Sequence, residues 1–212
     1  MGGPTLKLAV LLSGGGTTLQ NVLDRIDAGE LPARVQVVVS SKPEAYGLER
    51  ARSRNIDTHV IARRDFPNSA AFSEAVTNTI EPYQPGLILL AGFMQLYRVP
   101  EKYLGKVMNI HPALIPAFCG KGLYGHRVHE AVLEHGAKVS GCTVHFVDNR
   151  YDHGPIIVQK TVPVLEGDTA ETLAARVFQK ECEAYPEAIR LFAEGRLVID
   201  GRRVKVLPAH CG

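Results

Sequence analysis

The sequence predicts an α/β fold, a doubly wound and mostly parallel twisted sheet of the Rossmann-like kind with helices on both faces and an antiparallel C-terminal part. Short, nearly continuous apolar runs, typical of strands buried on both faces, alternate with segments whose apolar residues recur at helical spacing. Nearer the C-terminus, apolar and polar residues alternate one by one, which indicates antiparallel strands. The 212 residues, 45% of them apolar, suit one domain with two halves, 1–105 and 106–212.

The first half of the chain predicts strands and helices in regular alternation. Thr17 and Gln20 have the spacing of a capping box, so the first helix should begin at Thr17, and Gly29 should end it. A later helix, capped at Asn68 or at the following serine, should end before Pro82. The expected strands are 6–12, 35–39, 59–61 and 87–91, and the helix between the second and third strands is 44–54.

The second half predicts a strand that ends near Pro112, followed by helices and two hairpins. Asp168 and Glu171 have capping-box spacing before a long helix, which Pro186 should kink or split. The other expected elements are a helix at 126–134, a half-exposed strand at 140–146, its hairpin partner at 155–164, and a terminal hairpin at 197–206 with a tight turn.

A glycine-rich segment between the first strand and the first helix predicts an anion site. Unpaired amides and the helix dipole meet there, and glycine allows a phosphate to approach closely. No lysine completes a P-loop, and Leu19 stands where the dinucleotide pattern needs glycine, so a phosphate monoester is favoured over ATP or NAD. The alternative is a glycine-rich turn without a ligand. The residues concerned are Gly14, Gly15, Gly16, Thr17 and Thr18.

Asn109 and His111 are two positions apart at a predicted strand end, so their side chains leave the same face. Pro112 biases His111 toward extended geometry. An amide and an imidazole held in this way can polarise a carbonyl and stabilise the charge that develops on it. Taken alone, the pattern is more typical of a strand end whose histidine bonds a neighbouring carbonyl.

Three segments should meet at one edge of the sheet, because ligands of such sheets gather at the carboxyl ends of the strands. These segments are 13–18, 92–94 and 109–112. Asp152, in the polar loop of the first hairpin, could reach a histidine at this edge, where a carboxylate beside an imidazole can relay a proton. The alternative is a turn aspartate that bonds only its own backbone.

Composition excludes several classes of function. The net charge of +2 comes without a dense basic block, so nucleic acid is not expected as a partner, and no apolar run is long enough for a membrane span. The first four residues do not resemble a signal peptide, and four scattered cysteines suggest reduced thiols, so a cytoplasmic protein is expected. His126, His129 and Glu130 should lie at the start of a helix. The spacing of three between the histidines could suit a metal, but no third ligand is evident, so a solvated helix face is favoured over a metal site.

Five motifs, in order and over roughly residues 6–197, resemble the folate-dependent phosphoribosylglycinamide formyltransferases. The resemblance implies the formyltransferase variant of the Rossmann-like fold and transfer of a formyl group from 10-formyltetrahydrofolate to glycinamide ribonucleotide in purine synthesis, without a metal. The motifs are Ser13-Gly14-Gly15-Gly16-Thr17-Thr18-Leu19-Gln20, Ala91-Gly92-Phe93-Met94, Asn109-Ile110-His111-Pro112, Thr143-Val144-His145-Phe146-Val147 and Asp152-His153-Gly154-Pro155-Ile156-Ile157.

The resemblance also implies roles for individual residues. Asn109, His111 and Asp152 would be catalytic, with Asn109 and His111 holding the oxyanion and Asp152 assisting proton transfer. Thr143 would support Asp152 through water, and the glycine loop would bind the substrate phosphate. Other substrate contacts would be Met94, Ile110, Pro112 and Glu181, and folate contacts would be Met94, Gln95, Leu96, Tyr97, Asp148, Asn149, Arg150 and Tyr151.

Departures from the family pattern fall at the edges of the implied site. Gln95 stands where some members carry arginine, Gly15 replaces a common asparagine, and the residues of 118–125 differ from a lysine-containing loop. His145 and His153 receive no role beyond structure, and either a monomer or a homodimer is expected.

Four other functions compete with this one. Formyltetrahydrofolate deformylase, in which water replaces the amine, and methionyl-tRNA formyltransferase would each need a further domain, for which the chain leaves no room. A non-catalytic phosphate-binding module would explain the glycine loop but not Asn109, His111 and Asp152. A metal-dependent hydrolase would rest only on His126, His129 and His153.

Overall fold

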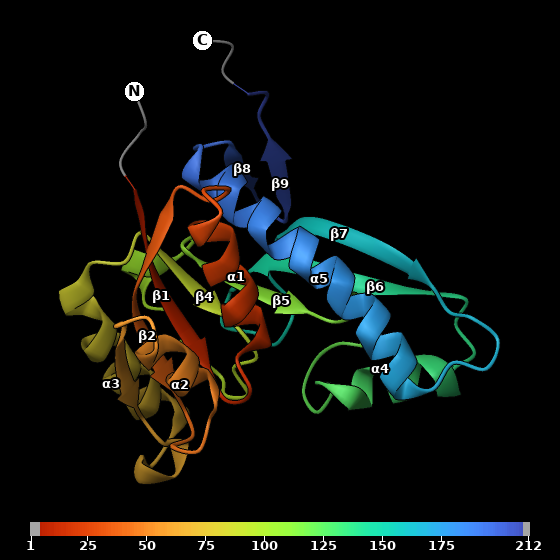
Figure 1. Cartoon of the computed structure of the whole chain (residues 1–212), viewed down its shortest axis with the longest axis horizontal. Helices are drawn as coiled ribbons and strands as arrows, with labels where there is room; N and C mark the ends of the chain where they lie inside the picture. Colours follow the sequence, from red (N-terminus) through yellow and green to blue (C-terminus); the bar gives the residue numbers. More distant parts are fainter. Residues whose placement is uncertain (1–4, 210–212) are drawn as a thin grey trace. The chain divides into compact units, whose positions relative to one another are not determined.

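The computed structural model describes residues 5–209, so the N-terminal segment and Cys211 lie outside the described residues. Two compact units divide the chain between Met108 and Asn109. Figure 1 labels most of the helices and strands of both units. The first unit contains β1 (Leu6–Leu12), α1 (Thr17–Asp27), β2 (Ala33–Ser40), α2 (Gly47–Arg52), β3 (Asp57–Val60), α3 (Ser69–Ile80) and β4 (Leu87–Leu90), with short 3-10 turns at Arg63–Asp65, Glu81–Tyr83 and Glu101–Tyr103.

Parallel strands form the centre of the first unit, in the order β3-β2-β1-β4. Their apolar runs are buried because helices pack against them: α2 contacts β2 and β3, and α3 contacts β2. Asn68 caps α3, its side chain accepting a hydrogen bond from the amide of Ala71. The expected order of strands and helices in this half is confirmed.

The predicted capping box at the start of α1 is wrong. Gly16, with φ 72°, is the N-cap residue, and no side chain caps the helix. A left-handed N-cap suits glycine, which has no Cβ to clash, and it turns the chain before Thr17 can act as a cap. Gln20 instead donates to Asp24 one turn further along. The second helix is also shorter than expected, Gly47–Arg52 in place of 44–54.

The second unit is built on a strand that runs through the boundary, β5 (Val107–His111), and its strand order is β5-β6-β7-β9-β8. Antiparallel pairs dominate it, as predicted for the C-terminal part. Figure 1 shows α5 lying along β6 and β7, which it contacts. The remaining elements are α4 (His126–Glu134), β6 (Val139–Phe146), β7 (Ile156–Pro163), α5 (Ala170–Ala193), β8 (Leu197–Asp200) and β9 (Arg203–Val206).

Three expectations for this unit are corrected. β6 is buried along nearly its whole length, not half-exposed, and the side chains of Thr143 and His145 find hydrogen-bond partners inside the unit. The N-cap of α5 is Thr169, one residue later than the predicted cap, and Thr169 and Thr172 form the capping box. Pro186 does not split α5, which continues across it while Tyr185, Pro186 and Ala188 are buried. Burial on both sides of the proline offsets the hydrogen bond that it cannot donate.

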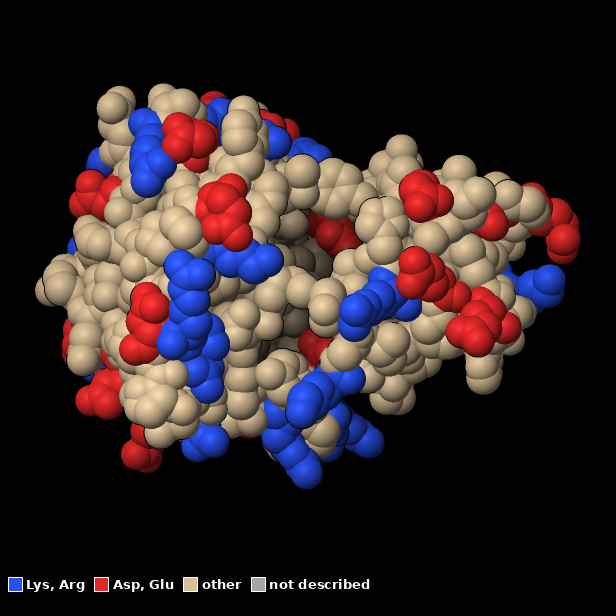
Figure 2. All heavy atoms as spheres, turned by 90° about the horizontal axis from the view of Figure 1, so that it is seen from below, with Lys and Arg blue, Asp and Glu red and all other residues tan. Residues whose placement is uncertain are grey.

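The distribution of surface charge and the state of the cysteines agree with what the composition predicted. On the face in Figure 2, basic side chains form several short clusters between acidic and uncharged ones, not one continuous band. Cys119, Cys142 and Cys182 are free thiols. Within residues 5–209, none of the helices has both the length and the apolarity that crossing a bilayer requires.

Candidate active site

The glycine loop of the first unit presents open backbone at the start of α1. Gly14, Gly15 and Thr17 are exposed, while Gly16 and Thr18 are half-buried. No acidic residue stands in the first turn of α1, so nothing there opposes an anion. Gly16 approaches Gly47 so closely that an added Cβ would lie 2.6 Å from the Gly47 Cα. The loop therefore has a fixed shape with its amides open to one side.

Serine hydroxyls join the loops that follow β1, β2 and β4. Ser13 Oγ lies 2.7 Å from Ser41 Oγ and accepts a hydrogen bond from the amide of Met94 at 2.9 Å. The amide of Ser13 donates to the Gly92 carbonyl. Two of the three segments expected at one edge, 13–18 and 92–94, are thus bonded within the first unit. Arg50 adds a positive charge beside the loop, since its Nε donates to the Gly15 carbonyl at 2.8 Å.

Gln95 lines a basic cavity of about 420 Å³ at the carboxyl ends of β2 and β3. Three cations, Lys42, Arg63 and Arg64, also line it, together with one carboxylate, Glu44. The predicted folate segment differs in exposure from one end to the other: Met94 is exposed, Gln95 and Leu96 are half-buried, and Tyr97 is 1% exposed. The Tyr97 hydroxyl bonds Thr77, and burial raises the pKa of Tyr97 to about 12. The Tyr97 side chain thus belongs to the core.

Asn109, His111 and Asp152 lie together in the second unit. Nδ2 of Asn109 is 3.4 Å from Oδ1 of Asp152, and Nδ1 of His111 is 3.7 Å from Oδ2. The amide of Gly120 donates to the same Oδ2 at 2.9 Å. Asp152 is therefore not a turn aspartate that bonds only its own backbone, because all these partners are distant in sequence.

His145 contacts Asn109, and the hydrogen bonds of His145 identify its tautomer. Nδ1 lies 2.7 Å from the Phe146 carbonyl, an acceptor, so Nδ1 carries the proton. Burial lowers the pKa of His145, which favours the neutral ring with a free lone pair on Nε2. Nδ2 of Asn109 is 3.2 Å from this nitrogen and donates to it. The contact directs the amino group of Asn109, not its oxygen, toward His145 and Asp152.

His111 also makes the neighbouring-carbonyl bond that its motif alone favoured. Its Nε2 donates to the carbonyl of Phe118 at 2.9 Å. Phe118 has φ 50°, a left-handed conformation that is unfavourable for a bulky residue, so the bond belongs to a loop held in a costly shape.

Thr143 supports the segment after His111. Its hydroxyl donates to the Ala113 carbonyl at 2.7 Å and accepts from the amide of Ile115 and from Gln159. The single hydroxyl proton is therefore committed to Ala113, which positions the chain just beyond His111.

The remaining predicted contacts are spread over the second unit. In the loop before Asp152, Asp148 is half-buried, and Asn149, Arg150 and Tyr151 are exposed. Ile110 is buried, and Pro112 and Glu181 are half-buried. Burial raises the pKa of the Glu181 carboxyl to about 7. Glu181 thus gains and loses its proton in the neutral pH range.

The histidine-containing helix α4 places its two histidines in different surroundings. His129 is buried, so the expectation of a solvated helix face is wrong for this residue, and burial lowers its pKa to about 4. His126 and Glu130 are exposed as expected. In the part of the chain that the structure describes, no three His, Cys, Asp or Glu side chains are grouped to hold a metal ion.

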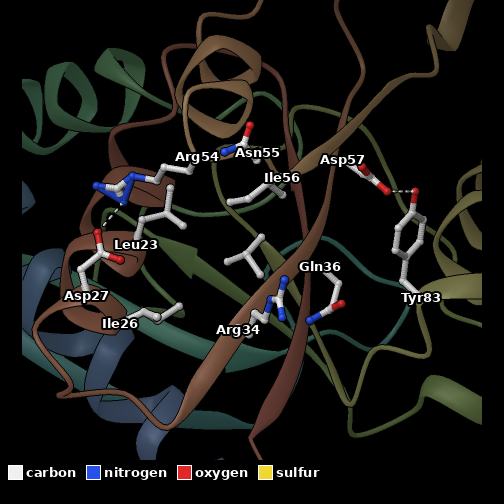
Figure 3. A pocket seen from close by; sticks show the side chains of 11 residues that line it. Leu23, Ile26, Asp27, Arg34, Gln36, Arg54, Asn55, Ile56, Asp57 and Tyr83 are labelled. Carbon is white, nitrogen blue, oxygen red and sulfur yellow. Dashed lines mark hydrogen bonds and ion pairs between the residues drawn. The ribbon is translucent and has the colours of Figure 1, made fainter.

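A cavity of about 490 Å³ lies elsewhere in the first unit, between α1 and the starts of β2 and β3 (Figure 3). Arg54 pairs with Asp27 on one side of it, and Tyr83 donates to Asp57 on the other. None of the predicted site residues lines this cavity. Since the glycine loop follows the other end of β1, the cavity and the glycine loop lie at opposite edges of the parallel strands.

Sequence reasoning missed the residues that hold the site in shape. His145, Gln159 and Gly120 contact the Asn109–Asp152 group or the segment beside it, and Ser13 and Arg50 secure the glycine loop. Only one of these residues had a local signal: His145 lies two positions from Thr143, so both side chains leave the same face of the strand.

Comparison with known proteins gives consistent matches over most of the chain. A model of the formyl transferase family matches residues 6–189. The phosphoribosylglycinamide formyltransferase of Haemophilus influenzae is 37% identical over 193 residues, which cover 90% of this chain and 89% of that protein. The crystal structure of glycinamide ribonucleotide transformylase 1 from Symbiobacterium toebii has a TM-score of 0.91 at 48% identity, covering 98% of this chain and 96% of that chain. A formyltetrahydrofolate deformylase from Pseudomonas syringae has a TM-score of 0.85 at 23% identity, covering 96% of this chain and 66% of that chain, a likeness of fold alone.

Proposed function

This chain belongs to the formyl transferase family and, within it, to the phosphoribosylglycinamide formyltransferases, and from this premise we propose that it transfers a formyl group from 10-formyltetrahydrofolate to the amine of glycinamide ribonucleotide. The observation that carries the proposal is the contact of the Asp152 carboxylate with both Asn109 and His111. In the proposed division of labour, residues 1–105 bind phosphate and residues 106–212 carry the chemistry.

The reaction begins when the substrate amine attacks the formyl carbon, which moves negative charge onto the formyl oxygen. Nε2 of His111 now donates to the Phe118 carbonyl, and the formyl oxygen would replace this carbonyl as the acceptor. Asn109 would turn its second N–H from Asp152 to the same oxygen while His145 keeps hold of the first. One such donor typically lowers the barrier by about 3 kcal/mol.

Proton transfer completes the reaction. Asp152 accepts the proton that the attacking nitrogen must lose and returns it, through water, to N10 of the folate as the carbon–N10 bond breaks. The carboxylate suits this role because it is only 12% exposed and lies beside the imidazole of His111. The products are the formylated amide and tetrahydrofolate, and the step requires no metal.

Binding of the ribonucleotide serves to position its amine. The open amides of Gly14, Gly15 and Gly16, with Thr17 and Thr18, would hold the phosphate, and Arg50 adds charge beside them. Glu181 would accept hydrogen bonds from the ribose. Because the phosphate does not react, its binding energy is available to orient the amine for attack.

The pteridine portion of the folate would bind along Met94 to Leu96 and the 148–151 loop, largely through backbone groups. Its tail ends in carboxylates, which need cations. Gln95 supplies none, but Lys42, Arg63 and Arg64 share its cavity, and we propose that they take this part.

The deciding experiment measures formyl transfer from 10-formyltetrahydrofolate with and without glycinamide ribonucleotide. Release of tetrahydrofolate that depends on the ribonucleotide, together with a formylated product, supports the transferase. Equal release without the ribonucleotide indicates a deformylase. Absence of turnover, with the ribonucleotide still bound, indicates a phosphate-binding module.

A further inference from the structure

We propose that Arg202, at the tip of the β8–β9 hairpin, is a positioning residue for the reaction, acting through His153 on the neighbouring Asp152. This proposal rests on the proposed function for its kinetic consequence. The hairpin lies beyond residues 6–189, where the formyl transferase match ends, so the family model does not describe this contact.

The loop that carries Asp152 has an uncommon backbone shape. Asp152 has φ 48° and Asn149 has φ 68°, left-handed values that Asn and Asp adopt more readily than other residues with a Cβ, but still at some cost in free energy. Ties from outside the loop's own backbone help to hold this shape. The base of the loop supplies one tie, a hydrogen bond from the amide of Phe146 to the Pro155 carbonyl at 2.9 Å.

His153 makes a second tie inside the loop. Its Nδ1 lies 2.6 Å from Oδ2 of Asp148, a carboxylate that can only accept, so Nδ1 carries a proton. The other oxygen of Asp148 accepts from the amide of Arg150 at 3.3 Å. The Asp148–His153 bond closes the chain between these two residues into a ring, and Asp152 is part of that ring.

Arg202 fastens this ring to the hairpin. Nη2 of Arg202 donates to the His153 carbonyl at 2.9 Å, and Nη1 lies 2.8 Å from Nε2 of the same residue. Nη1 is also 3.2 Å from Nδ1, so it lies over the ring face next to both nitrogens, and the guanidinium packs against the imidazole. Nη1 of Arg150 is 3.5 Å from Nε2. One guanidinium thus holds both the backbone and the ring of the residue next to Asp152.

The hairpin can serve as an anchor because it is fixed at its edge and at its base. Arg203 of β9 pairs with Ile156 of β7, just after the loop. At the base, the amide of Leu207 donates to the Arg196 carbonyl, and Nε of Arg196 donates to the Leu207 carbonyl, both at 2.8 Å. Val198 and Ile199 are 42% exposed, so the hairpin depends on these polar contacts more than on apolar burial.

The test compares Arg202→Ala with two variants of the same hairpin. Arg203→Ala removes an equal charge from an exposed neighbour, and Lys205→Ala breaks the ion pair with Asp200. We expect Arg202→Ala to lower kcat about fivefold, with KM for glycinamide ribonucleotide and Tm close to wild type, whereas both controls keep the wild-type kcat. Arg202→Lys, which can keep the bond to the His153 carbonyl but lacks the second guanidinium nitrogen over the ring, should fall between. The proposal is overturned if Arg202→Ala keeps the wild-type kcat or if the controls lose as much.

Two further measurements separate this proposal from the function on which it rests. Amide hydrogen exchange of residues 148–154 should rise several-fold in Arg202→Ala and not in Arg203→Ala, whatever reaction the protein catalyses. His153→Ala should lower kcat by as much as Arg202→Ala, and the double variant should lose no more than either one. Unchanged exchange, or additive losses, contradicts the positioning role even if formyl transfer is confirmed. If wild type shows no transfer but exchange rises, the proposed function fails and the structural tie stands.

Discussion

The amide of Asn109 donates to Nε2 of His145 over 3.2 Å, and this contact decides which way the Asn109 side chain faces. The ring of His145 is itself held by its bond to the Phe146 carbonyl. An asparagine without such a neighbour could present either its oxygen or its nitrogen to a substrate. In the proposed reaction only the nitrogen is useful, so His145 is expected to act on catalysis without touching the substrate.

We expect His145→Ala to lower kcat roughly tenfold, because the released amide can rotate away from the formyl oxygen. KM for the ribonucleotide should change little. His145→Gln, whose side-chain oxygen can still accept from Asn109, should recover part of the loss. Steady-state kinetics of the three proteins checks this, and a glutamine variant no better than the alanine variant would argue against orientation as the role.

Replacing the proposed catalytic groups should separate turnover from binding. Asn109→Ala and Asp152→Asn are expected to lower kcat about a hundredfold, the usual effect of removing one preorganised donor or acceptor. Calorimetry should still show the ribonucleotide binding to each variant, because the glycine loop is untouched. Asp200→Asn, an exposed aspartate of the terminal hairpin, is the matched control for the Asp→Asn change and should keep its activity. Near-normal turnover in either site variant would remove that residue from the mechanism.

The raised pKa of Glu181 predicts that the stability of the protein depends on pH. Burial raises its folded pKa from 4.5 to about 7, so the folded protein binds the proton more tightly than the unfolded chain does. The associated stability is fully present below pH 4.5 and is lost as the pH rises through 7. Glu181→Gln, which cannot ionise, should therefore match wild type at low pH and exceed it above pH 7 by roughly 1 to 3 kcal/mol. Urea unfolding across this pH range checks the sign, and parallel curves would contradict it.

Gly154 has no room for a side chain. A Cβ there would lie 1.8 Å from the Phe146 carbonyl oxygen, at the base of the Asp152 loop. We expect Gly154→Ala to destabilise the protein by about 2 to 4 kcal/mol, because the backbone at Phe146 or at residue 154 must move to make room for the Cβ. Gly15→Ala, where a Cβ meets nothing within 4 Å, should keep the wild-type Tm. Calorimetric melting of both variants checks the contrast, which fails if the two melt alike.

Asn68 should contribute measurably to the stability of α3. Its side chain accepts from the amide of Ala71, so Asn68→Ala leaves a helix amide without its cap and should cost about 1 kcal/mol. Ser69→Ala, one position on, leaves the side-chain bond of the cap intact and should be nearly neutral. Denaturant unfolding measures both changes, and a loss at Ser69 equal to that at Asn68 would place the cap elsewhere.

The order of elements followed from the sequence because it depends on local patterns. Buried apolar runs and helical periodicity located the strands and helices of both units, and Asn68 was correctly named as a cap. The errors arose where tertiary packing overrides local preference. Gly16 took the capping position of α1, and burial on both sides of Pro186 kept α5 continuous. Neither outcome is contained in a short stretch of sequence.

The site was predictable only in its motifs. Asn109, His111 and Asp152 were expected to meet and do lie together, but their roles remain predictions. The bonds from His145, Gly120 and Arg202 could not be predicted, because each joins residues more than thirty positions apart. The polar residues of β6 suggested a half-exposed strand for the same reason, because the buried partner of Thr143, the Ala113 carbonyl, lies 30 positions away.

The hydroxyl of Ser13 connects two loops of the first unit, so that the order of one loop depends on the order of the other. One oxygen contacts both Ser41 and the amide of Met94, so the glycine loop and the segment proposed for folate share a single hydrogen-bonded junction. Ordering one loop therefore lowers the entropy that the other must lose when its ligand binds. If the two loops bind phosphate and folate as proposed, the two affinities are thermodynamically linked, and by reciprocity each ligand would strengthen the binding of the other by the same factor.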